Sequence, residues 1–178
     1  EAINYSFISK LSCDRLELEP DDPRRHMVDI LNPLSEDQSV MRTSLIPGLL
    51  ETMHYNISVQ NRNLKLFEIG NVFYNTGKED SQPDEVEMLS CLWTGARVDS
   101  VWFSKEIKCD FYDLKGVVEE LFMNMGIVDT TFTSMPPESC FYTKSGYSAQ
   151  IFVETDLIGL VGEIHPKVLR NYDLKQTA

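Results

Sequence analysis

The acidic, thiol and imidazole groups that could do chemistry are scattered along this sequence and form no compact motif. Asp110, Asp113 and Glu119 lie on one stretch with helical spacing. Acids at the start of a helix usually cap its free N–H groups and favour its dipole. Cys109 precedes Asp110, but no histidine lies nearby in the sequence to deprotonate its thiol. These residues therefore predict helix capping and not nucleophilic or acid–base catalysis.

Neither a phosphate-binding loop nor a metal site is indicated. Gly159 and Gly162 alternate with apolar residues, which is more typical of close packing within a strand than of a phosphate cradle. His165 is followed by Pro166, a pair that suits the entry to a helix. The histidines are dispersed, and no two cysteines have the C-x-x-C spacing of a zinc site. Free thiols in a reducing compartment are expected for Cys13, Cys91, Cys109 and Cys140.

The charge of the chain argues against direct binding of nucleic acid. Its 28 acidic and 16 basic residues give a formal net charge of −12, whereas phosphate backbones are bound by clustered Lys and Arg. The nearest basic cluster, residues 24–26, is separated from Asp21 and Asp22 by Pro23 alone. No apolar run approaches the roughly 18 residues that span a bilayer, and no signal sequence is recognisable. We expect a cytoplasmic protein with no membrane contact.

Two amphipathic helices stand out. Residues 44–60 carry apolar side chains every four residues, with Thr43 or Ser44 available as a cap and Pro47 in the first turn. Residues 113–125 carry a second stripe, and Gly126 follows where a helix would stop. The two stripes are formed by Leu45, Ile46, Leu49, Leu50, Met53 and Ile57, and by Leu114, Val117, Val118, Leu121, Phe122 and Met125.

The remaining apolar pattern predicts strands in hairpins. Residues 64–74 and 86–94 form one candidate pair, and residues 147–153 and 158–164 form a second pair with a tight turn. Shorter strands are predicted at residues 2–8 and 26–31, and a short helix opens at Pro166. Hairpins interrupted by a few helices indicate an α+β fold with helices packed on an antiparallel sheet. A length of 178 residues favours a single domain.

Four blocks of this sequence resemble a known family. The blocks are residues 32–50, 66–73, 110–116 and 159–166, and they occur in the expected order. Asn56, which follows the first block, also matches. Together they resemble the core module of the β chain of bacterial phenylalanine–tRNA ligase, over essentially the whole chain. One departure is local, because residues 141–149 lack the His-Pro-Gly expected there.

The resemblance implies a class II aminoacyl-tRNA synthetase-like core spanning residues 1–178, excised from a longer β chain. In that family the α subunit holds the active site, with ATP and magnesium, and the β chain carries a degenerate copy of the fold. The implied partners are the α subunit and the rest of the β chain, with tRNA reached only through the whole assembly. The editing and anticodon-binding modules of a full β chain are not recognisable in this segment.

An active class II enzyme needs two arginines to hold ATP while a carboxylate attacks its α-phosphate. By resemblance, Tyr74 occupies the place of the first, and no arginine occurs from residue 64 to residue 96. The second motif corresponds to residues 159–166, where Glu163 would repel a triphosphate and Arg170 lies about a turn too far along. We therefore expect no catalytic residue and no bound cofactor in this chain.

Three functions remain open from the sequence. The leading one is a subunit-interface module; the alternatives are a free-standing, ATP-using synthetase-like ligase and a small-molecule or peptide-binding domain. The helical stripe of residues 44–60 could equally pack inside the domain, and only the resemblance favours contact with the α subunit. Arg42 and Glu68 are expected to form a structural ion pair, because an unpaired charge among apolar neighbours is unfavourable. The candidate interface residues are Asn32, Pro33, Arg42, Ser44, Leu45, Pro47, Leu49, Met53, Tyr55 and Asn56.

Overall fold

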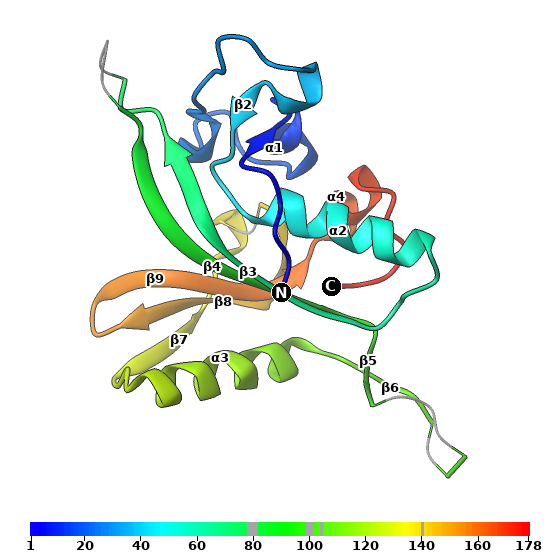
Figure 1. Cartoon of the computed structure of the whole chain (residues 1–178). Helices are drawn as coiled ribbons and strands as arrows, with labels where there is room; N and C mark the ends of the chain where they lie inside the picture. Colours follow the sequence, from blue (N-terminus) through cyan, green and yellow to red (C-terminus); the bar gives the residue numbers. More distant parts are fainter. Residues whose placement is uncertain (78–81, 99–101, 104, 140) are drawn as a thin grey trace. The chain divides into compact units, whose positions relative to one another are not determined.

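The computed structural model describes residues 1–77, 82–98, 102–103, 105–139 and 141–178 (Figure 1). The backbone contacts group into two compact units. Unit 1 comprises residues 1–92 and 171–173, and unit 2 comprises residues 93–170 and 174–178. Among the described residues, no helix is long and apolar enough to cross a bilayer. The interpretation of the whole chain as a single domain stays a prediction.

Unit 1 contains one long helix and one pair of long strands. Helix α2 (Ile46–Ser58) precedes strand β3 (Leu64–Tyr74), which is hydrogen-bonded to β4 (Asp84–Thr94). Along β3, Leu64, Glu68 and Val72 are buried and Lys65, Phe67 and Ile69 are exposed, as expected for a strand with one covered face. Short elements complete the unit: β1 (Phe7–Ile8), α1 (Ser12–Arg15), η1 (Pro23–Arg25), η2 (Glu36–Gln38) and β2 (Val40–Met41).

Helix α2 follows the predicted stripe but is shorter at both ends than residues 44–60. Leu49, Leu50 and Met53 are fully buried, so the stripe packs inside unit 1. The helix begins at Ile46, and its cap position, Leu45, has no side-chain hydrogen bond. Thr43 was a wrong choice of cap, since its hydroxyl donates to the carbonyl of Arg24 at 2.6 Å. Ser44 contributes, because its Oγ accepts from the N–H of Ile46 at 3.3 Å.

Tyr172 lies in the core of unit 1 with an unsatisfied hydroxyl. The residue is 1% exposed, and its Oη has no hydrogen-bond partner within the part of the chain that the structure describes. The guanidinium carbon of Arg15 lies 3.7 Å from the ring centroid, and burial raises the pKa of the phenol. The ring therefore contributes packing and a cation–π contact, while the hydroxyl contributes only the penalty of burying a polar group.

Tyr172→Phe should therefore leave the free energy of unfolding unchanged or raise it by about 1 kcal/mol, since it removes an unsatisfied hydroxyl and keeps the ring. Urea unfolding of the variant, followed by circular dichroism, measures the change. The matched control is Tyr74→Phe, because the Tyr74 hydroxyl donates to the carbonyl of Thr43 at 3.2 Å and its loss should destabilise. A loss of more than about 1 kcal/mol in Tyr172→Phe would contradict the prediction.

Unit 2 is a three-stranded antiparallel sheet covered by a helix. The strand order is β7 (Thr130–Ser134), β8 (Thr143–Val153), β9 (Asp156–Ile164). Helix α3 (Phe111–Met125) runs along this sheet (Figure 1). The core consists of Ala149, Ile151 and Val161, against which Phe111, Leu114, Val118, Phe122 and Phe132 pack. The other elements are β5 (Ala96–Val98), β6 (Ile107–Lys108), η3 (Pro137–Ser139) and α4 (Pro166–Asn171).

The ends of α3 have the predicted capping residues. Asp110 accepts from the N–H groups of Tyr112 and Asp113 at 2.8 and 3.2 Å. The side chain of Asp113 in turn accepts from the N–H of Asp110 at 2.9 Å, which completes a capping box. Gly126 ends the helix with φ of +72°, a left-handed conformation that favours glycine. The helix begins at Phe111, two residues before the predicted start.

The α+β fold class and its antiparallel sheets are confirmed, with three corrections to the elements. The strand predicted over residues 2–8 is reduced to β1, because residues 2–6 bond to side chains and isolated backbone groups of unit 1. Residues 26–31 form only an isolated bridge between Asp29 and Val40. Strand β7 was not predicted, since it contains a single large apolar residue, Phe132. Cys13, Cys91 and Cys109 are free thiols, and Cys140 lies outside the described residues.

Candidate functional site

A buried ion pair connects the segment before α2 to strand β3. Nη1 of Arg42 donates to Oε1 of Glu68 at 2.6 Å, with side-chain exposures of 6% and 2%. The Arg42 guanidinium also donates to the carbonyls of Asn71, at 2.9 Å, and Asn4, at 3.4 Å. The ion pair expected from the sequence is therefore present. These carbonyl contacts give the buried guanidinium further hydrogen bonds beyond the ion pair, which is what a buried charge requires.

Asn4 completes this network, although no sequence pattern indicated it as a functional or buried residue. Its backbone N–H and its Nδ2 donate to the two carboxylate oxygens of Glu68 at 3.2 and 2.7 Å. Its Oδ1 accepts from the hydroxyl of Thr52 on α2 at 2.8 Å. Asn4 thus joins the N-terminal segment, α2 and β3. We call Asn4, Arg42, Thr52 and Glu68 the buried polar cluster.

Two glycines make room for the buried polar cluster. A Cβ added to Gly48 would lie 3.0 Å from Cβ of Asn4. A Cβ added to Gly70 would overlap the guanidinium of Arg42. Both glycines fall inside the blocks that resemble the ligase β chain, so part of that pattern encodes close packing around buried charge.

Half of the ten predicted interface residues are buried within the chain. Arg42, Leu45, Pro47, Leu49 and Met53 belong to the core, and Ser44 and Asn56 are half-buried. They can serve an interface only by holding the exposed side chains of the same segment. Those are Asn32, Pro33 and, on α2, Tyr55, which is 67% exposed.

Asn56 is occupied by contacts within the chain. Its Nδ2 donates to the carbonyl of Thr52 at 2.9 Å, and its Oδ1 accepts from Nδ2 of Asn61 at 3.1 Å. It therefore stabilises the end of α2 and the turn that follows. Tyr55 is left as the large exposed side chain among the predicted residues of this helix.

The two positions expected to have lost their arginines carry groups that do not suit a triphosphate. Tyr74 donates its hydroxyl to the carbonyl of Thr43 at 3.2 Å, and burial raises the pKa of this phenol, so it stays neutral. Glu163 is negative and accepts at both carboxylate oxygens, each 3.1 Å from Nζ of Lys144. No cluster of three metal-ligating side chains occurs among the described residues. Neither Tyr74 nor Glu163 offers the positive charge that would hold a triphosphate.

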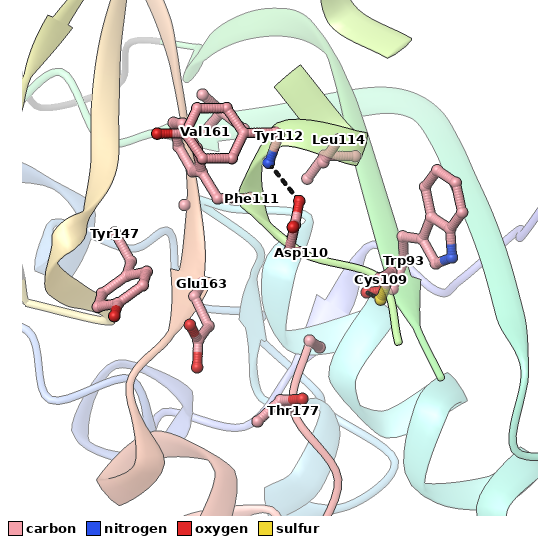
Figure 2. Close-up of a pocket in the computed structure, with 12 residues that line it drawn as sticks. Trp93, Cys109, Asp110, Phe111, Tyr112, Leu114, Tyr147, Val161, Glu163 and Thr177 are labelled. Atoms are coloured by element: carbon pink, nitrogen blue, oxygen red, sulfur yellow. Dashed lines mark hydrogen bonds between the residues drawn. The ribbon is translucent and has the colours of Figure 1, made fainter. Parts of the chain in front are cut away.

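Unit 2 contains a cavity of about 210 Å³ at the start of α3 (Figure 2). Figure 2 shows Tyr147 and Glu163, from neighbouring strands, beside the same space as Asp110 and Phe111. Cys109 and Asp110, for which the sequence predicted no nucleophilic role, both line this cavity. The full lining is Trp93, Cys109, Asp110, Phe111, Tyr112, Leu114, Tyr147, Val161, Gly162, Glu163, Thr177 and Ala178.

The comparisons with known proteins agree on one family. A family model described as the phenylalanyl tRNA synthetase beta chain CLM domain matches residues 1–178. A phenylalanine–tRNA ligase beta subunit from Syntrophotalea carbinolica is 44% identical over 99% of the chain. The one from Syntrophus aciditrophicus is 43% identical over 100% of the chain. The chain covers 22% of the length of each of these two relatives.

The fold is also found among solved structures. Pyrrolysyl-tRNA synthetase from Desulfitobacterium hafniense matches with a TM-score of 0.67 and 14% sequence identity. The match covers 99% of this chain and 57% of that one. At this identity the likeness shows a shared fold of the class II synthetase type.

Proposed function

The chain belongs to the family of CLM domains of phenylalanyl-tRNA synthetase β chains, and from that premise we propose that it is a non-catalytic module that helps bind the catalytic α subunit. It acts in a cytoplasmic assembly that aminoacylates tRNA. The α subunit binds ATP and magnesium there, and tRNA reaches this module only through the whole assembly.

The non-catalytic part of the proposal rests on the residues at the two positions where an active class II enzyme has arginine, which are Tyr74 and Glu163. Stabilising the transition state of adenylate formation takes fixed positive charge beside the α-phosphate. Tyr74 is neutral and hydrogen-bonded within unit 1, and Glu163 is an anion held by Lys144 in unit 2. A lysine that is already paired cannot replace the bidentate grip of a guanidinium on phosphate.

The exposed side of α2 supports the interface part. Interfaces are anchored by aromatic side chains at their centre with polar groups around them. Tyr55 is exposed on a helix whose opposite side is fixed by Leu49, Leu50 and Met53. The helix is also tied to β3 through the buried polar cluster. A rigid helix presenting an exposed tyrosine suits a binding surface for a partner subunit.

The chain alone should catalyse no ATP–pyrophosphate exchange with phenylalanine, at any magnesium concentration. Removing even one transition-state donor from an enzyme typically costs 10²–10³ in rate, and here both arginine positions lack the group. The assay uses the 178-residue chain freed of α subunit. Its matched control is the assembled ligase at equal concentration. Exchange above background that tracks with the purified chain would instead support the alternative, a free-standing ATP-using ligase.

A further inference from the structure

We propose that the cavity at the start of α3 binds a small organic ammonium ion with an apolar or aromatic body, through Glu163 and Tyr147. This site lies outside the residues proposed for the α-subunit interface. Glu163 belongs to the segment that resembles the second catalytic motif, but binding a cation there involves no adenylate chemistry.

The lining of the cavity selects for the charge of the ligand. The twelve described residues that line it include two carboxylates, Asp110 and Glu163, and no basic side chain. Anionic ligands such as phosphates and carboxylates are therefore disfavoured. Most of the remaining lining is aromatic or aliphatic, including Phe111, Leu114 and Val161, and would cover an apolar body. A volume of about 210 Å³ falls below that of most drug-sized ligand sites, which restricts the ligand to a small molecule.

The two carboxylates differ in what they can still bind. Asp110 is engaged by the first N–H groups of α3 as the helix cap. Glu163 lies on β9 and accepts from Lys144 at both oxygens. A carboxylate offers about four acceptor positions, so Glu163 can accept further donors from a ligand beside Lys144 or in its place. Glu163 is therefore the group that would hold an ammonium.

The chain already binds one ammonium with the same two groups. Nζ of Lys144 lies 3.9 Å from the ring centroid of Tyr147 and 3.1 Å from each oxygen of Glu163. An aromatic face combined with a carboxylate is the usual arrangement for recognising organic cations. Lys144 thus shows that the Tyr147 ring and the Glu163 carboxylate can bind an ammonium together. Because it occupies both groups, Lys144 should compete with a ligand.

A distortion of β8 brings these groups together. Thr143 pairs with Ile164 and Ser148 pairs with Gly162, so residues 144–147 of β8 face the single residue Glu163 of β9. Gly146, with φ of +80°, allows the bulge to turn. The bulge places Lys144 in contact with both Glu163 and the ring of Tyr147. It falls within residues 141–149, the stretch that lacks the His-Pro-Gly expected there.

The test is a titration of the 178-residue chain with phenethylamine, protonated at pH 7, followed by NMR of the backbone amides. Binding should shift the amides of Phe111, Tyr147 and Glu163. The charge-reversed probe 3-phenylpropionate should bind at least about tenfold more weakly, as expected when a charge-assisted hydrogen bond is replaced by repulsion. Equal affinities for the two probes, or shifts confined to other residues, would overturn the proposal.

Two variants of opposite effect sharpen the test. Glu163→Gln should weaken phenethylamine binding about tenfold, and Lys144→Met should strengthen it about threefold or more by removing the competitor. The matched controls are Glu119→Gln and Lys115→Met. Lys115 and Glu119 also form an ion pair beside an aromatic ring, that of Phe132, but neither lines the cavity. Unchanged affinity in Glu163→Gln, or weaker binding in Lys144→Met with an intact amide spectrum, would overturn the proposal.

Discussion

Arg42→Met should lower the free energy of unfolding by about 3–5 kcal/mol, because it leaves the carboxylate of Glu68 buried without its cation. Glu68 would keep only the hydrogen bonds from Asn4. A loss of this size is a large share of the roughly 5–15 kcal/mol that stabilises a typical protein. Urea unfolding followed by circular dichroism measures it as a lower midpoint at constant slope.

Two further variants make this result specific to the buried pair. Arg97→Met removes an ion pair with Asp113 in which the arginine side chain is 45% exposed, and it should cost less than about 1 kcal/mol. Arg42→Met combined with Glu68→Leu should be less destabilising than Arg42→Met alone, since no unpaired charge remains. If Arg42→Met and Arg97→Met lower the free energy of unfolding by similar amounts, the buried Arg42–Glu68 pair does not stabilise the protein in the way we infer.

Tyr55→Glu should weaken assembly of the full β chain with the α subunit by about 30-fold or more. Central aromatic residues of interfaces typically contribute 2 kcal/mol or more, and a carboxylate adds the cost of burying a charge. Because Tyr55 is 67% exposed, the substitution should leave the fold intact. Affinity is measured by titrating labelled α subunit with the purified β chain.

The matched control for Tyr55→Glu is Tyr112→Glu, the same change at a residue that is 75% exposed on α3. It should leave assembly unchanged. Circular dichroism of both variants checks that each is folded. If Tyr55→Glu assembles with α as tightly as the parent chain, α2 serves only the core, and the contact lies on another face.

The sequence predicted those parts of the structure that depend on local pattern. β3 matches its predicted bounds, and the Asp110 cap and Gly126 stop of α3 follow from residue type and position. The Arg42–Glu68 pair was predictable because a charge flanked by apolar residues has to be neutralised. Asn4 was not, since its partner Glu68 is 64 residues away and an asparagine in a short predicted strand gives no signal of burial.

The cavity could not be predicted for a different reason. It depends on the bulge at residues 144–147, and a bulge is a property of how two strands pair. Four largely polar residues before a strand are equally compatible with a loop. Sequence reasoning identified this stretch only as a departure from the family, without indicating that Lys144 contacts both Tyr147 and Glu163.

The close packing of Gly48 against Asn4 has a consequence for how this family varies over evolution. A side chain at position 48 would have to displace the asparagine that bridges α2 and β3. Substitutions at these two positions are therefore expected to be correlated across relatives. A homologue with alanine or a larger residue at the place of Gly48 should carry a shorter side chain at the place of Asn4, and Thr52 should then be free to drift. The two positions are 44 residues apart in the chain, yet substitutions at one should be accompanied by substitutions at the other.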